Sequence, residues 1–305
     1  MSDLVDLLDT SHFQNGLLLG LLALAVGWML SLAFGRKRPP LPIGGFLITA
    51  ATFGALHLAE EPLNSAVPAL VLVAIGSLAT RLLEMPRWVQ PFAVMPGAVW
   101  LAVDTAGTEL QWVRVLMMVL IPLGGFLISD FELRHDRMGL GVVFLTLAVL
   151  GVFAAVPDTE EALVLMAAAV PITLLAWPRV RISLGSEGAY LAVATFLWVA
   201  AAGGGGRPAS IVGASACLGL LLLEPIVVAV NPLAIKVMTW LTNSPAGAVV
   251  ASIPQVLLVF VCSRFAARLT QEPLALLVVI VAYGATIVIG WKASTSNLDS
   301  RRSAT

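Results

Sequence analysis

The chain has 305 residues, of which 59% are hydrophobic and 11% are charged, and its net charge is −1; its mean hydropathy is +0.97. Soluble domains carry about 25% charged residues, so this composition excludes a water-soluble globular protein, and the charge balance provides no basic face for nucleic acid. We expect an all-α, polytopic transmembrane helix bundle whose main solvent is the lipid bilayer.

Eleven apolar runs follow one another along the chain. They cover residues 16–35, 41–58, 66–80, 91–107, 112–129, 138–156, 162–177, 188–202, 209–230, 247–262 and 273–291. Because a spanning helix needs about 20 mostly apolar residues, each run is predicted to cross the bilayer once. The loops between the runs are short, so we expect residues 1–305 to form a single integral-membrane domain with no soluble domain.

The charges of the loops predict the orientation. The segment before the first run is acidic and has no Lys or Arg, which predicts a retained anchor rather than a cleaved signal. Basic residues gather in the loops after runs one, three, five and seven: Arg36, Lys37, Arg38, Arg81, Arg87, Arg134, Arg137, Arg179 and Arg181. Such loops stay in the cytoplasm, so the N-terminus is expected outside. Arginine outnumbers lysine by 14 to 3, which favours a multi-pass protein of a bacterial cytoplasmic (inner) membrane.

The last third of the chain allows more than one count of spans. Eleven spans place Arg264 and Arg268 outside, against the charge rule. A break of the ninth run at Glu224 would make residues 226–242 a separate span and bring both arginines inside, but it would bury Lys236 and put the basic tail outside. We expect eleven spans, with ten or twelve as the alternatives.

Glu224 is the first candidate for a substrate or ion pathway, because an ionisable side chain inside a span costs about 2.5–3.5 kcal/mol on insertion scales. Pro225 follows it directly and frees backbone carbonyls, and Asn231 precedes a second proline, Pro232. A carboxylate beside an unwound helix suits ion or proton coupling. The alternative is a hydrated carboxylate near the cytoplasmic end of the span.

Three further candidates lie near the predicted outer face. Asp104 ends the fourth run and Arg114 begins the fifth, where they would either recognise an anion or close a helical hairpin as an interfacial ion pair. His57 ends the second run beside Glu60 and Glu61. This set would bind a metal or sense pH, or it is simply the hydrated end of a helix.

The inner loop at residues 130–137 holds Asp130, Glu132, His135 and Asp136 but contains no metal or nucleotide motif. We predict that it is solvated. The sequence therefore predicts neither a metal site nor a cofactor.

Small residues recur at helical spacing in the ninth run, at Gly213, Ser215 and Gly219. This pattern predicts close helix packing, either with a membrane-protein partner or with a second copy of the chain.

Three functions fit these features. The number of runs, the prolines inside them and Glu224 favour a transporter, permease or flippase-like protein for a small or lipid-linked substrate. The scarcity of polar groups favours a non-catalytic subunit or scaffold of an envelope complex, which needs no polar cavity. A membrane-embedded lipid-modifying enzyme needs acidic, basic or His side chains that converge at one depth, and it is the least favoured of the three.

Overall fold

The computed structural model describes residues 10–34, 40–61, 63, 65–105, 111–134, 140–155, 160–176 and 181–203. The last three predicted runs lie outside the described residues, and so do the candidates Glu224 and Asn231 and the small residues Gly213, Ser215 and Gly219. Within the described ranges every regular element is a helix and no strand occurs, which confirms the all-α prediction there.

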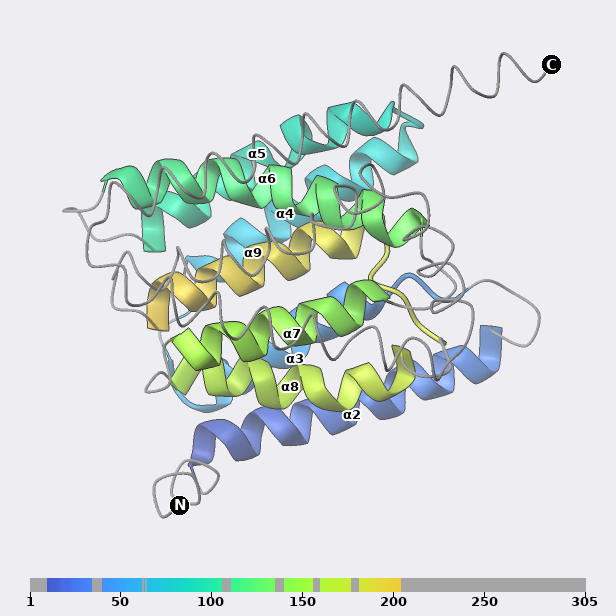
Figure 1. The fold of residues 1–305 in the computed structure, drawn as a ribbon, viewed down its shortest axis with the longest axis vertical. Coiled ribbons are helices and arrows are strands. Elements are labelled where there is room, and N and C mark those ends of the chain that lie inside the picture. The colour runs from blue at the N-terminus through green and yellow to red at the C-terminus, as the bar shows by residue number, and fades with distance from the viewer. Residues whose placement is uncertain are drawn as a thin grey trace, which may run out of the picture.

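Each of the first eight predicted runs coincides with one α-helix. In chain order the elements are α2 (Ser11–Phe34), α3 (Gly44–Leu58), α4 (Ala66–Leu82), the short 3-10 helix η1 (Arg87–Val89), α5 (Gln90–Thr105), α6 (Gln111–Arg134), α7 (Leu140–Ala155), α8 (Glu160–Ala176) and α9 (Ser186–Gly203). The α-helices lie side by side along one common direction (Figure 1). The largest differences from the predicted bounds are at α2, which begins at Ser11 instead of residue 16, and at α6, which continues past residue 129 to Arg134.

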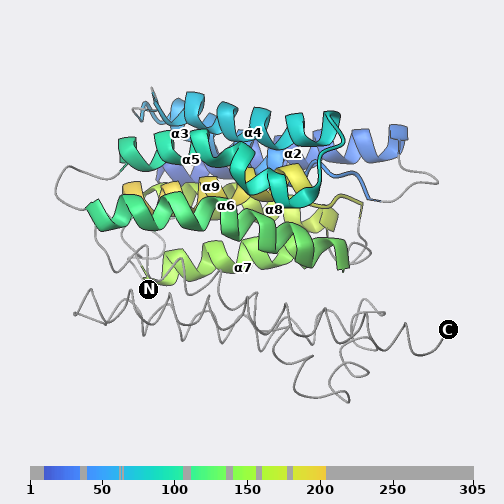
Figure 2. The ribbon, with the colours of Figure 1, turned by 90° about the horizontal axis from the view of Figure 1, so that it is seen from above.

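α9 is the central helix of the described part. It lies among the other helices in both views (Figures 1 and 2) and packs against α3, α4, α5, α6, α7 and α8. Every residue from Ala189 to Ala201 is at most 7% exposed. A helix that is apolar on all sides is stable where all its sides are buried, which explains why this almost uniformly apolar sequence occupies the centre.

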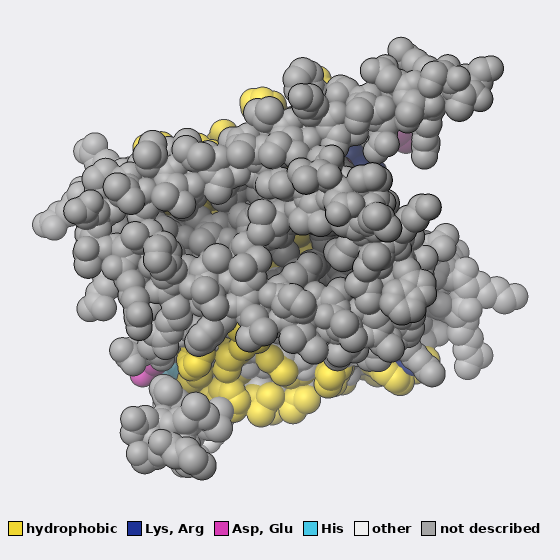
Figure 3. Space-filling model, in the orientation of Figure 1, with side chains coloured by type: hydrophobic (Ala, Val, Ile, Leu, Met, Phe, Trp, Pro, Cys, Tyr) yellow, Lys and Arg dark blue, Asp and Glu magenta, His cyan; other side chains and the backbone are white. Residues whose placement is uncertain are grey.

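α2 lies at the edge of the bundle and has two different sides. Its glycines face α8 so closely that a Cβ atom on Gly16 would lie 2.8 Å from the Val164 carbonyl oxygen, and one on Gly20 would lie 2.7 Å from that of Ala168. The other side exposes large apolar side chains: Leu17, Leu18, Leu21, Leu22, Trp28, Met29, Leu32 and Phe34. They form part of the yellow band along the lower edge of the molecule in Figure 3.

The lengths of the helices bear on the predicted spans. Among the described helices, α2 is the one that is long and apolar enough to cross a membrane by length and composition. Shorter apolar stretches occur at Gly44–Leu58, Ala66–Leu82, Gly141–Phe153 and Ser186–Ala202. Length and composition therefore support one crossing in this part of the chain, and the eleven-span arrangement stays a prediction.

Candidate functional site

Two extended segments that are far apart in the sequence lie side by side at one end of the bundle. Leu41 and Ile182 form an isolated parallel bridge. The Leu41 N–H donates to the Arg181 carbonyl at 3.1 Å, and the Ser183 N–H donates to the Leu41 carbonyl at 2.9 Å. The pairing continues into α3, where the Gly44 N–H donates to the Ser183 carbonyl at 2.7 Å. α3 and α9 therefore begin next to each other.

Glycines make this close approach feasible. A Cβ atom on Gly45 would lie 2.1 Å from the Gly188 carbonyl oxygen, so α3 and α9 touch backbone to backbone. Gly185 has a φ of +78°, a left-handed conformation that residues with a side chain rarely adopt. It turns the chain from the extended segment into α9. The paired segments form the floor of the candidate site.

Glu132, near the C-terminal end of α6, holds this floor in place. Its carboxylate accepts hydrogen bonds from the N–H groups of Leu184 and Gly185, the second at 2.8 Å, and the residue is only 4% exposed. These N–H groups lie just before α9, so the carboxylate also faces the positive end of the helix dipole. The predicted solvated loop at residues 130–137 is therefore wrong for residues 130–134, because α6 continues through them and buries Glu132.

A second buried carboxylate, that of Glu187, lies in the first turn of α9. It is 2% exposed and pairs with the Arg81 guanidinium, at the end of α4, over 3.1 Å. The Ser186 hydroxyl donates to its other oxygen at 2.8 Å. A buried charge is tolerated when it is paired and hydrogen-bonded, so this ion pair ties α4 to the start of α9.

The turn from α4 to α5 supplies the remaining polar side chains. Glu84 and Arg87 are exposed there, and Gln90 is 6% exposed in the first turn of α5. Neither the Glu84 nor the Arg87 side chain makes a hydrogen bond or an ion pair with another described residue, although the Glu84 N–H donates to the Arg81 carbonyl at 3.1 Å. Glu84 has a φ of +50°, which is uncommon for a residue with a side chain. The tight turn brings both charged side chains to the mouth of the site.

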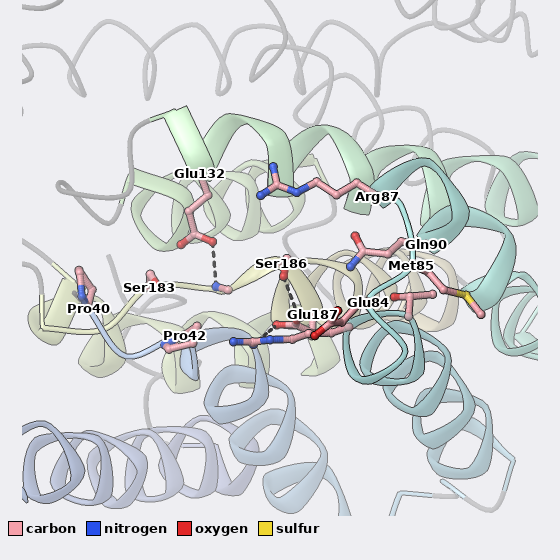
Figure 4. A pocket seen from close by; sticks show the side chains of 13 residues that line it. Pro40, Pro42, Glu84, Met85, Arg87, Gln90, Glu132, Ser183, Ser186 and Glu187 are labelled. Carbon is pink, nitrogen blue, oxygen red and sulfur yellow. Dashed lines mark hydrogen bonds and ion pairs between the residues drawn. The ribbon is translucent and has the colours of Figure 1, made fainter. Parts of the chain in front are cut away.

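Together these groups line a pocket of about 440 Å³. Its wall consists of Pro40, Pro42, Thr80, Arg81, Glu84, Met85, Arg87, Gln90, Glu132, Ser183, Gly185, Ser186 and Glu187. In Figure 4, Arg87 and Gln90 reach in from one side, while Glu132, Ser186 and Glu187 lie around the floor. The volume falls within the range of small-molecule sites, about 300–1,000 Å³.

Several residues that neighbour Arg81, Glu84 and Arg87 in the sequence have exposed apolar side chains. They are Leu82, Leu83, Met85, Trp88 and Phe92, and the rings of Trp88 and Phe92 meet edge to face with their centroids 6.5 Å apart. We call this set the apolar rim. It places a charged pocket and an apolar surface next to each other.

The three described candidates from the sequence do not line this pocket. Asp104 lies near the C-terminal end of α5, where the Ser65 hydroxyl donates to its carboxylate. Arg114 lies in the first turn of α6 and His57 is exposed in the last turn of α3. The antiparallel order of α3, α4, α5 and α6 puts these residues at the end of the bundle opposite Glu132.

Sequence reasoning assigned Glu132 to a solvated loop and did not single out Glu187, but the sequence holds a signal for the burial of Glu132. Gly125, Ile128 and Glu132 are three and four residues apart, which places them on one face of a helix. A Cβ atom on Gly125 would lie 2.2 Å from the Tyr190 ring, so this face of α6 points at α9. Extending the helical period beyond the apolar run would have placed Glu132 on the buried face.

The polar groups of the pocket differ in how far they are already engaged within the protein. Both buried carboxylates are engaged, that of Glu132 by backbone N–H groups and that of Glu187 by Arg81 and Ser186. Among the described residues that line the pocket there is neither a His nor a Cys, which are common acid–base and nucleophilic groups. The donors on offer to a ligand are the guanidinium groups of Arg81 and Arg87, the Gln90 amide and the Ser183 hydroxyl.

Comparison with protein-family models, with curated proteins and with solved structures finds no match for the chain.

Proposed function

We propose that the protein is a multi-pass protein of a bacterial cytoplasmic membrane, that it acts as a flippase-like permease for a lipid-linked substrate, and that the pocket binds the phosphate-bearing head group of that substrate. The observation that carries this proposal is the charged pocket of about 440 Å³ beside the exposed apolar rim. A lipid-linked molecule has the same division into a charged head and an apolar chain.

The orientation of the pocket follows from the predicted eleven-span topology. Arg81 and Arg87 line the pocket, and Arg181 accepts a hydrogen bond at its floor through its carbonyl. All three belong to the basic loops that are expected in the cytoplasm. The head group would therefore be captured from the inner leaflet.

The free donors suit a phosphate. Arg87 has no ion-pair partner among the described residues, and Arg81 remains 60% exposed at its side chain while it pairs with Glu187. Guanidinium groups bind phosphate oxygens through short, charge-assisted hydrogen bonds. The Gln90 amide adds a neutral donor, and the exposed Glu84 carboxylate can accept a hydrogen bond from a hydroxyl group of the same head group.

The pocket also supports this proposal over its two alternatives. A scaffold subunit needs no polar cavity, whereas the described part of the chain has one. A lipid-modifying enzyme needs a side chain that is free to exchange a proton or attack the substrate; the buried carboxylates of Glu132 and Glu187 are each held by donors, and the remaining carboxylate, Glu84, is exposed. Binding and movement of a head group can use the other polar groups of the pocket, which are those of Arg81, Arg87, Gln90 and Glu84.

Lipid binding and lipid movement can be measured separately. We would titrate purified full-length protein in nanodiscs with dioleoyl phosphatidic acid and follow binding by native mass spectrometry, with dioleoylglycerol as the probe that lacks the phosphate. R87Q removes the free guanidinium, and R114Q is the matched control at the opposite end of the bundle. Movement would be followed in proteoliposomes with a fluorescent phosphatidic acid and a quencher added outside.

We expect phosphatidic acid to bind at least tenfold more tightly than dioleoylglycerol, R87Q to lose that preference and R114Q to keep it. Equal binding by the wild type and R87Q would refute the head-group site. Normal binding without protein-dependent movement of the fluorescent lipid would refute the flippase-like activity and leave a lipid-binding protein.

A further inference from the structure

We propose that the end of the bundle opposite the pocket holds a site for a divalent transition metal of the Zn²⁺ class, formed by His12, Glu61 and Glu160. One potential ligand atom from each of these residues lies within 4.8 Å of those of the other two. The site is separate from the pocket, so it stands or falls independently of lipid binding.

The three residues come from three elements that pack on one another. His12 lies in the first turn of α2, Glu61 follows α3, and Glu160 begins α8. His12 Nε2 lies 3.4 Å from Glu61 Oε1, and His12 Nδ1 lies 3.3 Å from Glu160 Oε2. In Figure 3, a His side chain and an acidic side chain show together at the end of the bundle from which α2 starts. The cluster therefore brings together side chains that the sequence separates by up to 148 residues.

Helix packing fixes the position of His12 relative to Glu160. α2 and α8 run parallel, and their backbones touch at Gly16 with Val164 and at Gly20 with Ala168. Both contacts join residues that are 148 positions apart, and residues four apart share one face of a helix. One turn earlier, the same register pairs His12 with Glu160. The geometry of the cluster is thus set by backbone contact and not by flexible side chains alone.

The distances suit a metal. Zn²⁺ binds His nitrogen and carboxylate oxygen at about 2.0–2.2 Å in tetrahedral geometry, in which neighbouring ligand atoms lie roughly 3.3–3.6 Å apart. Taken singly, each contact of His12 with a carboxylate has this length, 3.4 Å to Glu61 and 3.3 Å to Glu160. The two contacts use opposite ring nitrogens, so one carboxylate must turn toward the nitrogen that binds. The Glu160 side chain is 57% exposed and is free to do so.

The charges also suit a divalent cation better than a proton. Glu61 and Glu160 carry two negative charges beside one imidazole, and a protonated imidazole balances only one of them. A divalent cation balances both and leaves the imidazole neutral, which is the form that coordinates metals. Three protein ligands leave the fourth position for water, which fits the partial exposure of this end.

The test measures metal binding by the full-length protein in detergent after removal of metals with EDTA. We would titrate Zn²⁺ by calorimetry, count bound zinc by mass spectrometry of the elements, and record the visible spectrum with Co²⁺, which reports tetrahedral nitrogen and oxygen ligands directly. The variants are H12Q, E61Q and E160Q. The matched controls are H57Q and E60Q, because His57 and Glu60 are exposed at the same end and are not part of the cluster.

We expect one Zn²⁺ per chain, a loss of affinity of at least tenfold in H12Q and E61Q, and no more than a twofold change in H57Q and E60Q. The Co²⁺ spectrum of the wild-type protein tests the site even if a variant does not fold. The proposal is overturned if the wild type binds no Zn²⁺ or if H12Q binds it as tightly as the wild type. It is also overturned if acidification in EDTA stabilises the protein and Zn²⁺ adds nothing, because the cluster is then an ion pair only.

Discussion

Removal of the Glu132 carboxylate is expected to loosen the pocket floor and destabilise the whole bundle. The E132A substitution leaves the Leu184 and Gly185 N–H groups, which now donate to that carboxylate, without this acceptor in a site where Glu132 is only 4% exposed. A hydrogen bond to a charged group contributes about 1.5–3 kcal/mol. Two such bonds give an expected loss of about 3–6 kcal/mol in the free energy of unfolding, since water has little access to replace the carboxylate.

Unfolding of the purified protein by a denaturing detergent, followed by circular dichroism, would measure this loss. E132Q keeps one acceptor oxygen and is expected to lose about half as much. E84A removes an exposed carboxylate from the same pocket and is expected to change stability by no more than about 0.5 kcal/mol. The reasoning would be refuted if E132A stayed within about 1 kcal/mol of the wild type, or if E84A were as damaging.

Two other predictions concern packing and pH. G45A is expected to lower the free energy of unfolding by about 3 kcal/mol, at the upper end for overpacking, because the added Cβ would lie 2.1 Å from the Gly188 backbone. G54A is the control, since its Cβ would meet only the flexible end of the Leu19 side chain, at 2.8 Å. In the same unfolding assay it should lower the free energy of unfolding clearly less. Burial, and then the nearby Glu61 and Glu160 carboxylates, raise the pKa of Glu161. The stability that the neutral form contributes is present below the unfolded pKa of about 4.3 and is lost as the pH rises through the folded value. In EDTA, the stability advantage of E161Q over the wild type should therefore grow with pH across that window and then level off, and a constant difference from pH 4 to pH 8 would contradict this cause.

The sequence predicted the helices well because the signal for them is local. Each of the first eight apolar runs lies within a few residues of one α-helix, since length and apolar content are properties of a single segment. The burial of α9 on all sides also fits a property of one segment, its almost uniformly apolar sequence. A local pattern could not show how many of these helices cross a membrane, because that depends on their surroundings.

The site was not predictable in the same way, because it depends on contacts between distant segments. The residues that hold the floor, Leu41, Glu132 and Gly185, lie in three separate stretches of the chain. The interpretation of His57 grouped it with Glu60 and Glu61, which are its neighbours in the sequence. In the structure the imidazole beside Glu61 is that of His12, which the packing of α2 on α3 and α8 brings there.

The parallel bridge between Leu41 and Ile182 also sets the order in which the protein can be completed. Ile182 follows Leu41 by 141 residues, so at about 5–20 residues per second a ribosome needs roughly 7–28 seconds to make the second segment after the first. During that interval the N–H groups of Gly44 and Gly45 lack the Ser183 and Leu184 carbonyls as acceptors, and the backbone of Gly45 lacks its contact with Gly188 of α9. The earlier helices therefore keep one face open until then, and the pocket is among the last parts of the described bundle to form.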